Sequence, residues 1–177
     1  MSVLNLKEFT SKLNILYAED SLTVRNITKN MLSEYFDNIN IAKDGQEALD
    51  LYKKYYEEHS KYYDIVFTDL EMPVMDGQKL SEYLLEFNPT QELVIISGID
   101  DFNKAIELIN VGIKKFIAKP IEELQLLAVV EDVVASMKKK YLQESQKELA
   151  TKVKELEEFS DALDAVSYTH LRAHETS

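Results

Sequence analysis

The chain has 177 residues and a formal net charge of −12, and hydrophobic residues make up 45% of it. This composition can fill a sizeable core, which excludes wholesale disorder, and the charge disfavours nucleic acid and anionic membranes as partners. The lack of Cys excludes disulfides, thiolate metal sites and a catalytic thiol. Residues 1–14 lack the apolar stretch of a signal peptide, and the longest aliphatic run, 126–130, is far too short for a membrane span. We therefore expect a cytoplasmic protein.

Short apolar segments alternate with segments of helical periodicity along residues 13–137. The expected strands are Asn14–Ala18, Asn38–Ala42, Ile65–Thr68, Leu93–Ile96 and Lys115–Ala118. The expected helices are Leu22–Tyr35, Gln46–Glu58, Gly77–Glu86, Phe102–Asn110 and Ile121–Lys140. Strands this short and apolar are typical of a parallel sheet that is buried on both faces. The alternation predicts a doubly wound α/β domain, which binds ligands beyond the carboxyl ends of its strands.

Polar and charged residues follow four of the five expected strands. They are Glu19 and Asp20 after the first, Asp69 after the third, Ser97 after the fourth and Lys119 after the fifth. Three clustered carboxylates require a cation, and all-oxygen ligands suit Mg²⁺. One carboxylate can then attack phosphorus to give an acyl phosphate, while the ammonium and the hydroxyl bind phosphoryl oxygens. Each residue alone is more often a cap or turn residue, but the ordered set indicates this chemistry.

Five segments resemble the motifs of the response regulator receiver family of two-component signalling. They are LYAEDS at 16–21, DGQEAL at 44–49, DIVFTDLEMPVMDG at 64–77, VIISG at 94–98 and FIAKP at 116–120. The resemblance covers residues 13–137 and implies a five-stranded parallel (βα)5, flavodoxin-like fold. It also implies a phosphoacceptor switch and not an enzyme. The implied phosphodonor is a histidine kinase or a phosphotransfer protein, with Mg²⁺ as cofactor.

The resemblance assigns roles to the acidic residues. Asp69 matches the aspartate that is phosphorylated and also binds the metal. Glu19 and Asp20 match the acidic metal pair, and Asp20 is expected to be the direct ligand. Glu71 matches the position whose backbone carbonyl binds the metal. Glu71 and Ile99 also flank the site at positions that tune the attack of water, so the lifetime of the phosphoryl group stays open.

The resemblance also assigns the residues that sense phosphorylation. Lys119 matches the lysine that pairs with the phosphoryl group, and its bond to Pro120 is expected to be cis. Ser97 matches the hydroxyl that moves toward the phosphoryl group. Phe116 matches the aromatic switch position, although its place in a strand, taken alone, favours a simple core phenylalanine. The expected readout is the surface formed by the fourth helix, the fifth strand and the fifth helix of the family fold.

The last expected helix continues beyond the receiver-like segment. Residues 121–166 contain no Gly or Pro, and Leu142, Leu149, Leu156 and Leu163 recur every seven residues. With leucine at heptad position d, the a positions are Lys139, Gln146, Val153 and Ser160. Leucine at d favours a parallel two-stranded coiled coil, and polar a residues weaken it. A homodimer through residues 139–166 is therefore predicted, with a single amphipathic helix packed against its own or a missing domain as the alternative.

The expected organisation is a lead-in at 1–12, a receiver at 13–137, a coiled-coil linker at 138–166 and a tail at 167–177. The linker would carry the signal to an output module that follows it. The tail, SYTHLRAHETS, resembles translated cloning sequence more than a native terminus.

Three other functions stay open. An aspartate-nucleophile phosphatase of the haloacid dehalogenase type would place a second Asp where this chain has Glu71. A binding scaffold with a dead site would not need the full set of site residues. The chain is also compatible with the receiver portion of a hybrid sensor kinase.

Overall fold

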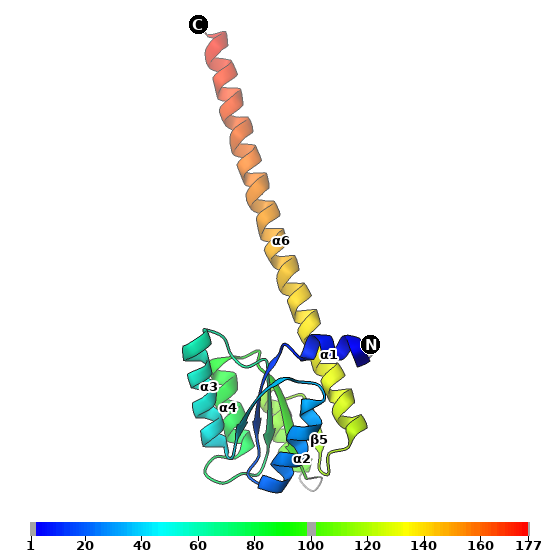
Figure 1. Cartoon of the computed structure of the whole chain (residues 1–177). Coiled ribbons are helices and arrows are strands. Elements are labelled where there is room, and N and C mark those ends of the chain that lie inside the picture. The colour runs from blue at the N-terminus through cyan, green and yellow to red at the C-terminus, as the bar shows by residue number, and fades with distance from the viewer. Residues whose placement is uncertain (1–2, 99–101, 177) are drawn as a thin grey trace. The chain divides into compact units, whose positions relative to one another are not determined.

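A computed structural model of the chain describes residues 3–98 and 102–176, so Ile99 and both extreme ends lie outside the described residues. The strands are β1 (Asn14–Ala18), β2 (Asn38–Ala42), β3 (Ile65–Asp69), β4 (Glu92–Ser97) and β5 (Lys115–Ala118). The helices are α1 (Val3–Thr10), α2 (Leu22–Ser33), α3 (Gly45–His59), α4 (Gly77–Phe87), α5 (Phe102–Val111) and α6 (Glu123–Glu175). All five predicted strands and all five predicted helices are present (Figure 1).

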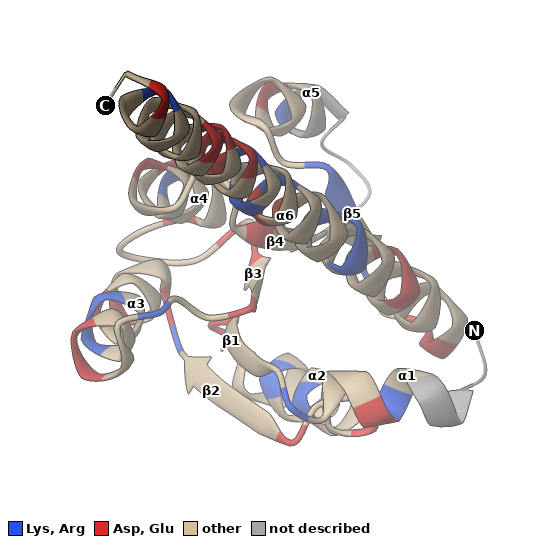
Figure 2. Cartoon of the chain, turned by 90° about the horizontal axis from the view of Figure 1, so that it is seen from above, with Lys and Arg blue, Asp and Glu red and all other residues tan. Residues whose placement is uncertain are grey.

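The strands form one parallel sheet in the order β2-β1-β3-β4-β5. Helices cover both faces, with α3, α4 and α5 on one side and α1 and α2 on the other (Figure 2). Successive strand residues point to opposite faces, so Leu16, Val66 and Ile95 join the core beneath α3, α4 and α5. The predicted doubly wound parallel fold is therefore confirmed.

The expectation of burial on both faces is wrong for β2. Asn38 and Asn40 are exposed, while Ile39 and Ile41 are half-buried. The reason is topological, because β2 is the edge strand of the sheet next to β1.

Helix α1 lies in the predicted lead-in and is absent from the helices predicted from the sequence. Leu6 is fully buried, and the Thr10 hydroxyl donates to the carbonyl oxygen of Tyr35 at 2.5 Å. Lys7 forms an ion pair with Asp37 at 2.9 Å. These contacts join residues far apart in the chain, so the local sequence carries little signal for this short helix.

Two Asp-Gly pairs begin the helices α3 and α4. The side chain of Asp44 accepts from the N–H of Glu47, and that of Asp76 accepts from the N–H of Lys79, both at 2.8 Å. These are N-caps, which satisfy backbone donors that have no partner inside a helix. Gly45 also donates its N–H to the carbonyl oxygen of Met75 at 3.1 Å, which ties the start of α3 to the loop after β3.

The first turns of α6 are tied to β5. The Gln125 amide donates to the carbonyl oxygen of Ala118 at 3.2 Å and accepts from its N–H at 2.9 Å. At the other end of β5, Lys115 forms ion pairs with Glu92 at 3.4 Å and Asp132 at 3.2 Å. The start of α6 is thereby held against the edge of the sheet.

The chain divides into two compact units, Met1–Val133 and Val134–Ser177. The boundary predicted from the sequence lies slightly later, after residue 137. The second unit is helical and continues beyond the predicted end of the linker at residue 166, because α6 ends at Glu175. Acidic and basic residues are mixed along α6 (Figure 2). Among the described residues, no helix has the length and apolar character needed to cross a membrane.

Candidate functional site

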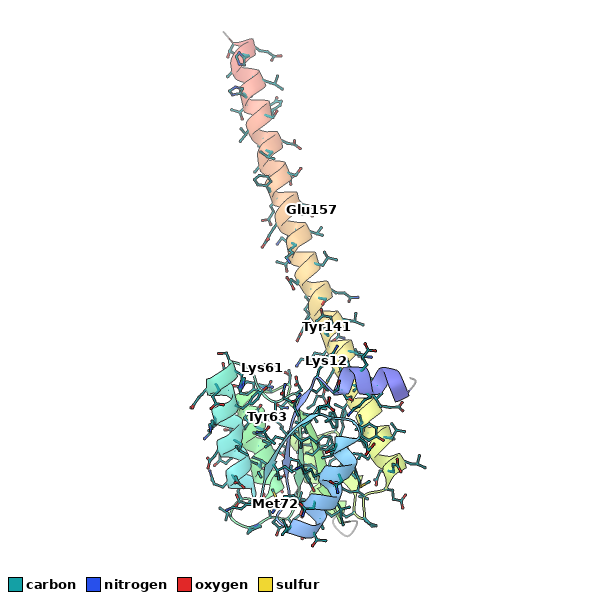
Figure 3. The ribbon with its side chains drawn as sticks, in the orientation of Figure 1. Lys12, Lys61, Tyr63, Met72, Tyr141 and Glu157 are labelled. Atoms are coloured by element: carbon teal, nitrogen blue, oxygen red, sulfur yellow. The ribbon has the colours of Figure 1, made fainter. Side chains whose placement is uncertain are left out.

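Three carboxylates meet beyond the carboxyl ends of β1 and β3. These strands are hydrogen-bonded neighbours, so the residues that follow them are adjacent. Carboxylate oxygens of Glu19, Asp20 and Asp69 all lie within 4.8 Å of one another. In Figure 3, Lys12 and Lys61, which precede β1 and β3, lie at one end of the sheet, and Met72, which follows β3, lies at the other. The acidic cluster is at the Met72 end.

Lys119 joins this cluster from the end of β5. Its ammonium nitrogen lies 2.8 Å from Oε2 of Glu19 and 3.0 Å from Oδ2 of Asp69. Its backbone N–H donates to the carbonyl oxygen of Ser97 at 2.8 Å, which fixes the position of the chain just after the strand. The predicted cis bond between Lys119 and Pro120 is confirmed.

Burial and the neighbouring charges have opposing effects on the pKa of Glu19 and on that of Lys119. Burial raises the pKa of Glu19, and the negative charge of Asp69 adds to the rise, while the hydrogen bond from Lys119 opposes it. Burial alone would lower the pKa of Lys119, but its hydrogen bonds and attraction to both carboxylates outweigh burial and raise it. Lys119 therefore stays charged. One ammonium faces three carboxylates, so the site retains an excess of negative charge that favours a divalent cation.

Glu19 and Asp20 differ in what they offer to a cation. Glu19 is 1% exposed, and its two carboxylate oxygens accept from Lys119 and from the N–H of Ser21 at 3.1 Å. Asp20 is exposed. The donor set is all oxygen, which fits Mg²⁺, and the more accessible oxygens belong to Asp20.

The remaining predicted site residues lie around this cluster. Ser97 is half-buried at the end of β4, and its hydroxyl donates to the carbonyl oxygen of Gly98 at 3.1 Å. Phe116 is half-buried and packs against the hydrophobic core. The side chain of Glu71 is 77% exposed and lies 3.4 Å from the ammonium of Lys104 on α5. The predicted metal-binding role of Glu71 uses its backbone carbonyl, so this ion pair does not bear on that role.

Sequence reasoning missed Arg25, which supports the acidic pair from α2. Its guanidinium donates to the carbonyl oxygens of Glu19 at 2.7 Å and Asp20 at 3.3 Å. The order of residues carries no signal for this contact, because it depends on how α2 packs against the sheet. The contact holds the backbone that presents the two carboxylates.

Gly77, the first residue of α4, lies directly against the backbone of Asp69. A Cβ atom at Gly77 would overlap the Asp69 carbonyl oxygen, whereas a Cβ at Gly98 would meet nothing within 4 Å. We expect Gly77→Ala to lower the free energy of unfolding by about 3 kcal/mol, because a backbone carbonyl cannot rotate away as a side chain would. Gly98→Ala, the matched control, should stay within about 0.5 kcal/mol of the wild type. Urea denaturation followed by circular dichroism measures both, and equal stabilities would contradict the steric argument.

Comparison with known proteins gives consistent matches over the first unit. A family model described as "Response regulator receiver domain" matches residues 15–131. The chemotaxis protein CheY of Halobacterium salinarum is 26% identical over 122 residues, which cover 69% of this chain and 97% of that protein. Probable histidine kinase 2 of Oryza sativa subsp. indica is 31% identical over 68% of this chain, but the match spans only 13% of that protein.

A solved structure gives the same result. The CheY complex with CheX, BeF3 and Mg²⁺ from Borrelia burgdorferi is matched with a TM-score of 0.60 and 33% identity. The match covers 69% of this chain and 89% of that one.

Proposed function

Because this chain belongs to the response regulator receiver domain family, we propose that it is a signalling switch in which Asp69 accepts a phosphoryl group from a phosphohistidine. The observation that carries the proposal is the position of Asp69, which is buried, lies within 4.8 Å of Glu19 and Asp20, and pairs with Lys119 at 3.0 Å. The charges expected to develop on a transferring phosphoryl group would be met there by an ammonium and a cation.

In the proposed transfer, a carboxylate oxygen of Asp69 attacks phosphorus opposite the donor imidazole. The new O–P bond forms as the N–P bond breaks, and the imidazole leaves with the bonding electron pair. Lys119 stabilises the negative charge on the phosphoryl oxygens. Mg²⁺, when bound, would neutralise both the carboxylates and the incoming phosphoryl group. The backbone carbonyl of Glu71 is the fourth proposed protein ligand of the metal.

We propose that Ser97 and Phe116 convert phosphorylation into a change of the surface formed by α5, β5 and α6. Ser97 would exchange its hydrogen bond to Gly98 for one to a phosphoryl oxygen. Phe116 has no hydroxyl, so its part in the switch would be a change in ring burial. The partner that supplies the phosphoryl group is proposed to be a histidine kinase or a phosphotransfer protein.

The proposal is tested by phosphorylating the wild-type chain with phosphoramidate, a small N–P donor, in the presence of Mg²⁺. We expect intact-mass spectrometry to show one added phosphoryl group, which is lost when EDTA replaces Mg²⁺. A chain that gains no phosphoryl group under these conditions would overturn the proposal. Steady turnover of a phosphomonoester would instead favour the phosphatase alternative.

Asp20 should make the largest single contribution to metal affinity, since it is the most exposed carboxylate of the cluster. We expect Asp20→Ala to weaken Mg²⁺ binding by roughly tenfold or more, because one full negative charge next to the ion is lost. Phosphorylation should slow in parallel. Isothermal titration calorimetry measures the affinity, and Asp161→Ala, an exposed position on α6, is the control. Unchanged Mg²⁺ affinity in the Asp20 variant would show that Asp20 is not a ligand.

A second candidate is a receiver module within a longer protein, such as a hybrid kinase. It is favoured by the rice kinase match, in which this chain spans only 13% of the relative's length. The chemistry proposed for Asp69 is the same in both cases. Phosphotransfer to a separately purified phosphotransfer domain would distinguish a relay module from a terminal switch.

A further inference from the structure

An exposed apolar stripe runs along the second unit. The side chains of Leu142, Leu149, Leu156 and Leu163 are 59%, 63%, 67% and 54% exposed. Every described residue from 141 to 176 is exposed, so nothing in the described chain covers these leucines. Most helical stability in proteins comes from packing of an amphipathic face, so this stripe calls for a partner helix.

We propose that residues 139–166 form a parallel, in-register, two-stranded coiled coil with a second copy of this chain. The leucines occupy successive d positions, and Val153, 46% exposed, adds an apolar residue at a. Leucine at d is the arrangement that favours two parallel strands. The inference concerns the second unit alone and stands or falls independently of the phosphorylation of Asp69.

The charges beside the stripe favour the parallel orientation. Lys152 lies at heptad position g, and Glu157 lies five residues later at e. In a parallel in-register dimer, each g residue faces the e residue of the next heptad in the other helix. Lys152 of each copy would therefore face Glu157 of the other, which gives two attractive pairs by symmetry. An antiparallel coil places g opposite g and e opposite e, and loses both pairs.

Lys152 can accommodate this second partner. Its ammonium is 2.7 Å from the carboxylate of Glu148 one turn earlier, and its side chain is 63% exposed. An ammonium has three N–H donors, so it can bind Glu148 and a carboxylate from the second copy together. The geometry adds an interhelical contact without breaking the existing one.

The polarity of the residues at the helix–helix contact differs between the two halves of the proposed coiled coil. Its first half has the polar residues Lys139 and Gln146 at a, which weaken pairing and disfavour shifted registers. Its second half is flanked by the exposed apolar residues Phe159 and Val166, both at g. The dimer should therefore depend on protein concentration and be held most firmly between residues 149 and 166.

Single cysteines test the register, because the chain has no Cys of its own. We expect full-length Leu149→Cys to form a disulfide-linked dimer under mild oxidation, since d residues of two parallel in-register helices meet across the seam. Thr151→Cys, at the outward position f, should remain largely monomeric on a non-reducing gel. Equal cross-linking of both variants, or of neither, would overturn the in-register coil.

Charge exchange tests the orientation. We expect Lys152→Glu and Glu157→Lys each to weaken dimerisation about tenfold, because two attractive pairs become repulsive. The double variant should recover most of the loss, as measured by sedimentation equilibrium. Circular dichroism serves as the control, because Lys152→Glu also breaks the pair with Glu148. The parallel pairing would be ruled out if the double variant did not recover affinity at equal helix content. A wild type that stays monomeric at high micromolar concentration would overturn the proposal entirely.

Discussion

Replacing Asp69 by Asn should abolish phosphorylation of the chain by phosphoramidate and Mg²⁺. An amide oxygen is a far weaker nucleophile than a carboxylate, and it brings no negative charge to the metal. The substitution keeps the shape of the side chain, and Lys119 keeps its 2.8 Å contact with Glu19, so the fold should be retained. Intact-mass spectrometry should therefore show the phosphoryl adduct in the wild type and none in the variant.

Asp76→Asn is a matched control for this experiment. Asp76 lies in the loop that follows Asp69 and caps α4, and Asn is as good an N-cap as Asp. The control should be phosphorylated like the wild type. Phosphorylation of the Asp69 variant at the wild-type rate would show that another carboxylate is the acceptor.

Replacing Lys119 by Met should leave a folded chain whose response to phosphorylation is lost. Met keeps much of the apolar stem but removes the ammonium that lies between Glu19 and Asp69. The two buried carboxylates then repel each other, so Mg²⁺ should raise the Tm of the variant more than that of the wild type. Phosphorylation should be slower, because the phosphoryl oxygens lose a positive partner.

The lost response can be measured at β5. Beryllium fluoride with Mg²⁺ mimics the phosphoryl group, and we expect it to shift the amide resonances of Ile117 and Ala118 in the wild type. In Lys119→Met most of that shift should disappear, because the residue that follows the strand no longer has an ammonium to bind the mimic. Lys114→Met, an exposed position before β5, is the control and should respond normally. A full shift in the Lys119 variant would contradict the role of Lys119 in connecting the phosphorylation site to β5.

The sequence predicts the sheet well because its strands are short, apolar and bounded by polar residues. It also predicts which side chains meet, because the carboxyl ends of parallel strands share one edge and each of the residues Glu19, Asp69 and Lys119 directly follows or ends a strand. The predictions fail where long-range contacts decide. The helix α1 depends on Thr10 and its distant partner Tyr35, and local periodicity does not encode such a pairing.

The directions in which side chains point are also not predicted by the sequence. Nothing in the order of residues indicates that the Glu71 carboxylate turns toward Lys104, or that Arg25 reaches back to the carbonyl oxygens of Glu19 and Asp20. Both contacts depend on the angle at which a helix packs on the sheet. That angle follows from the whole core and not from a motif.

The amide of Gln125 also has a consequence for the sheet as an assembly. The outward N–H and C=O groups of an edge strand can recruit a strand from another molecule and so start aggregation. In β5 these groups of Ala118 are both occupied by Gln125, in the first turn of α6. A single side chain thus occupies the outward backbone groups of Ala118 and blocks strand addition at this end of β5, beside Lys119.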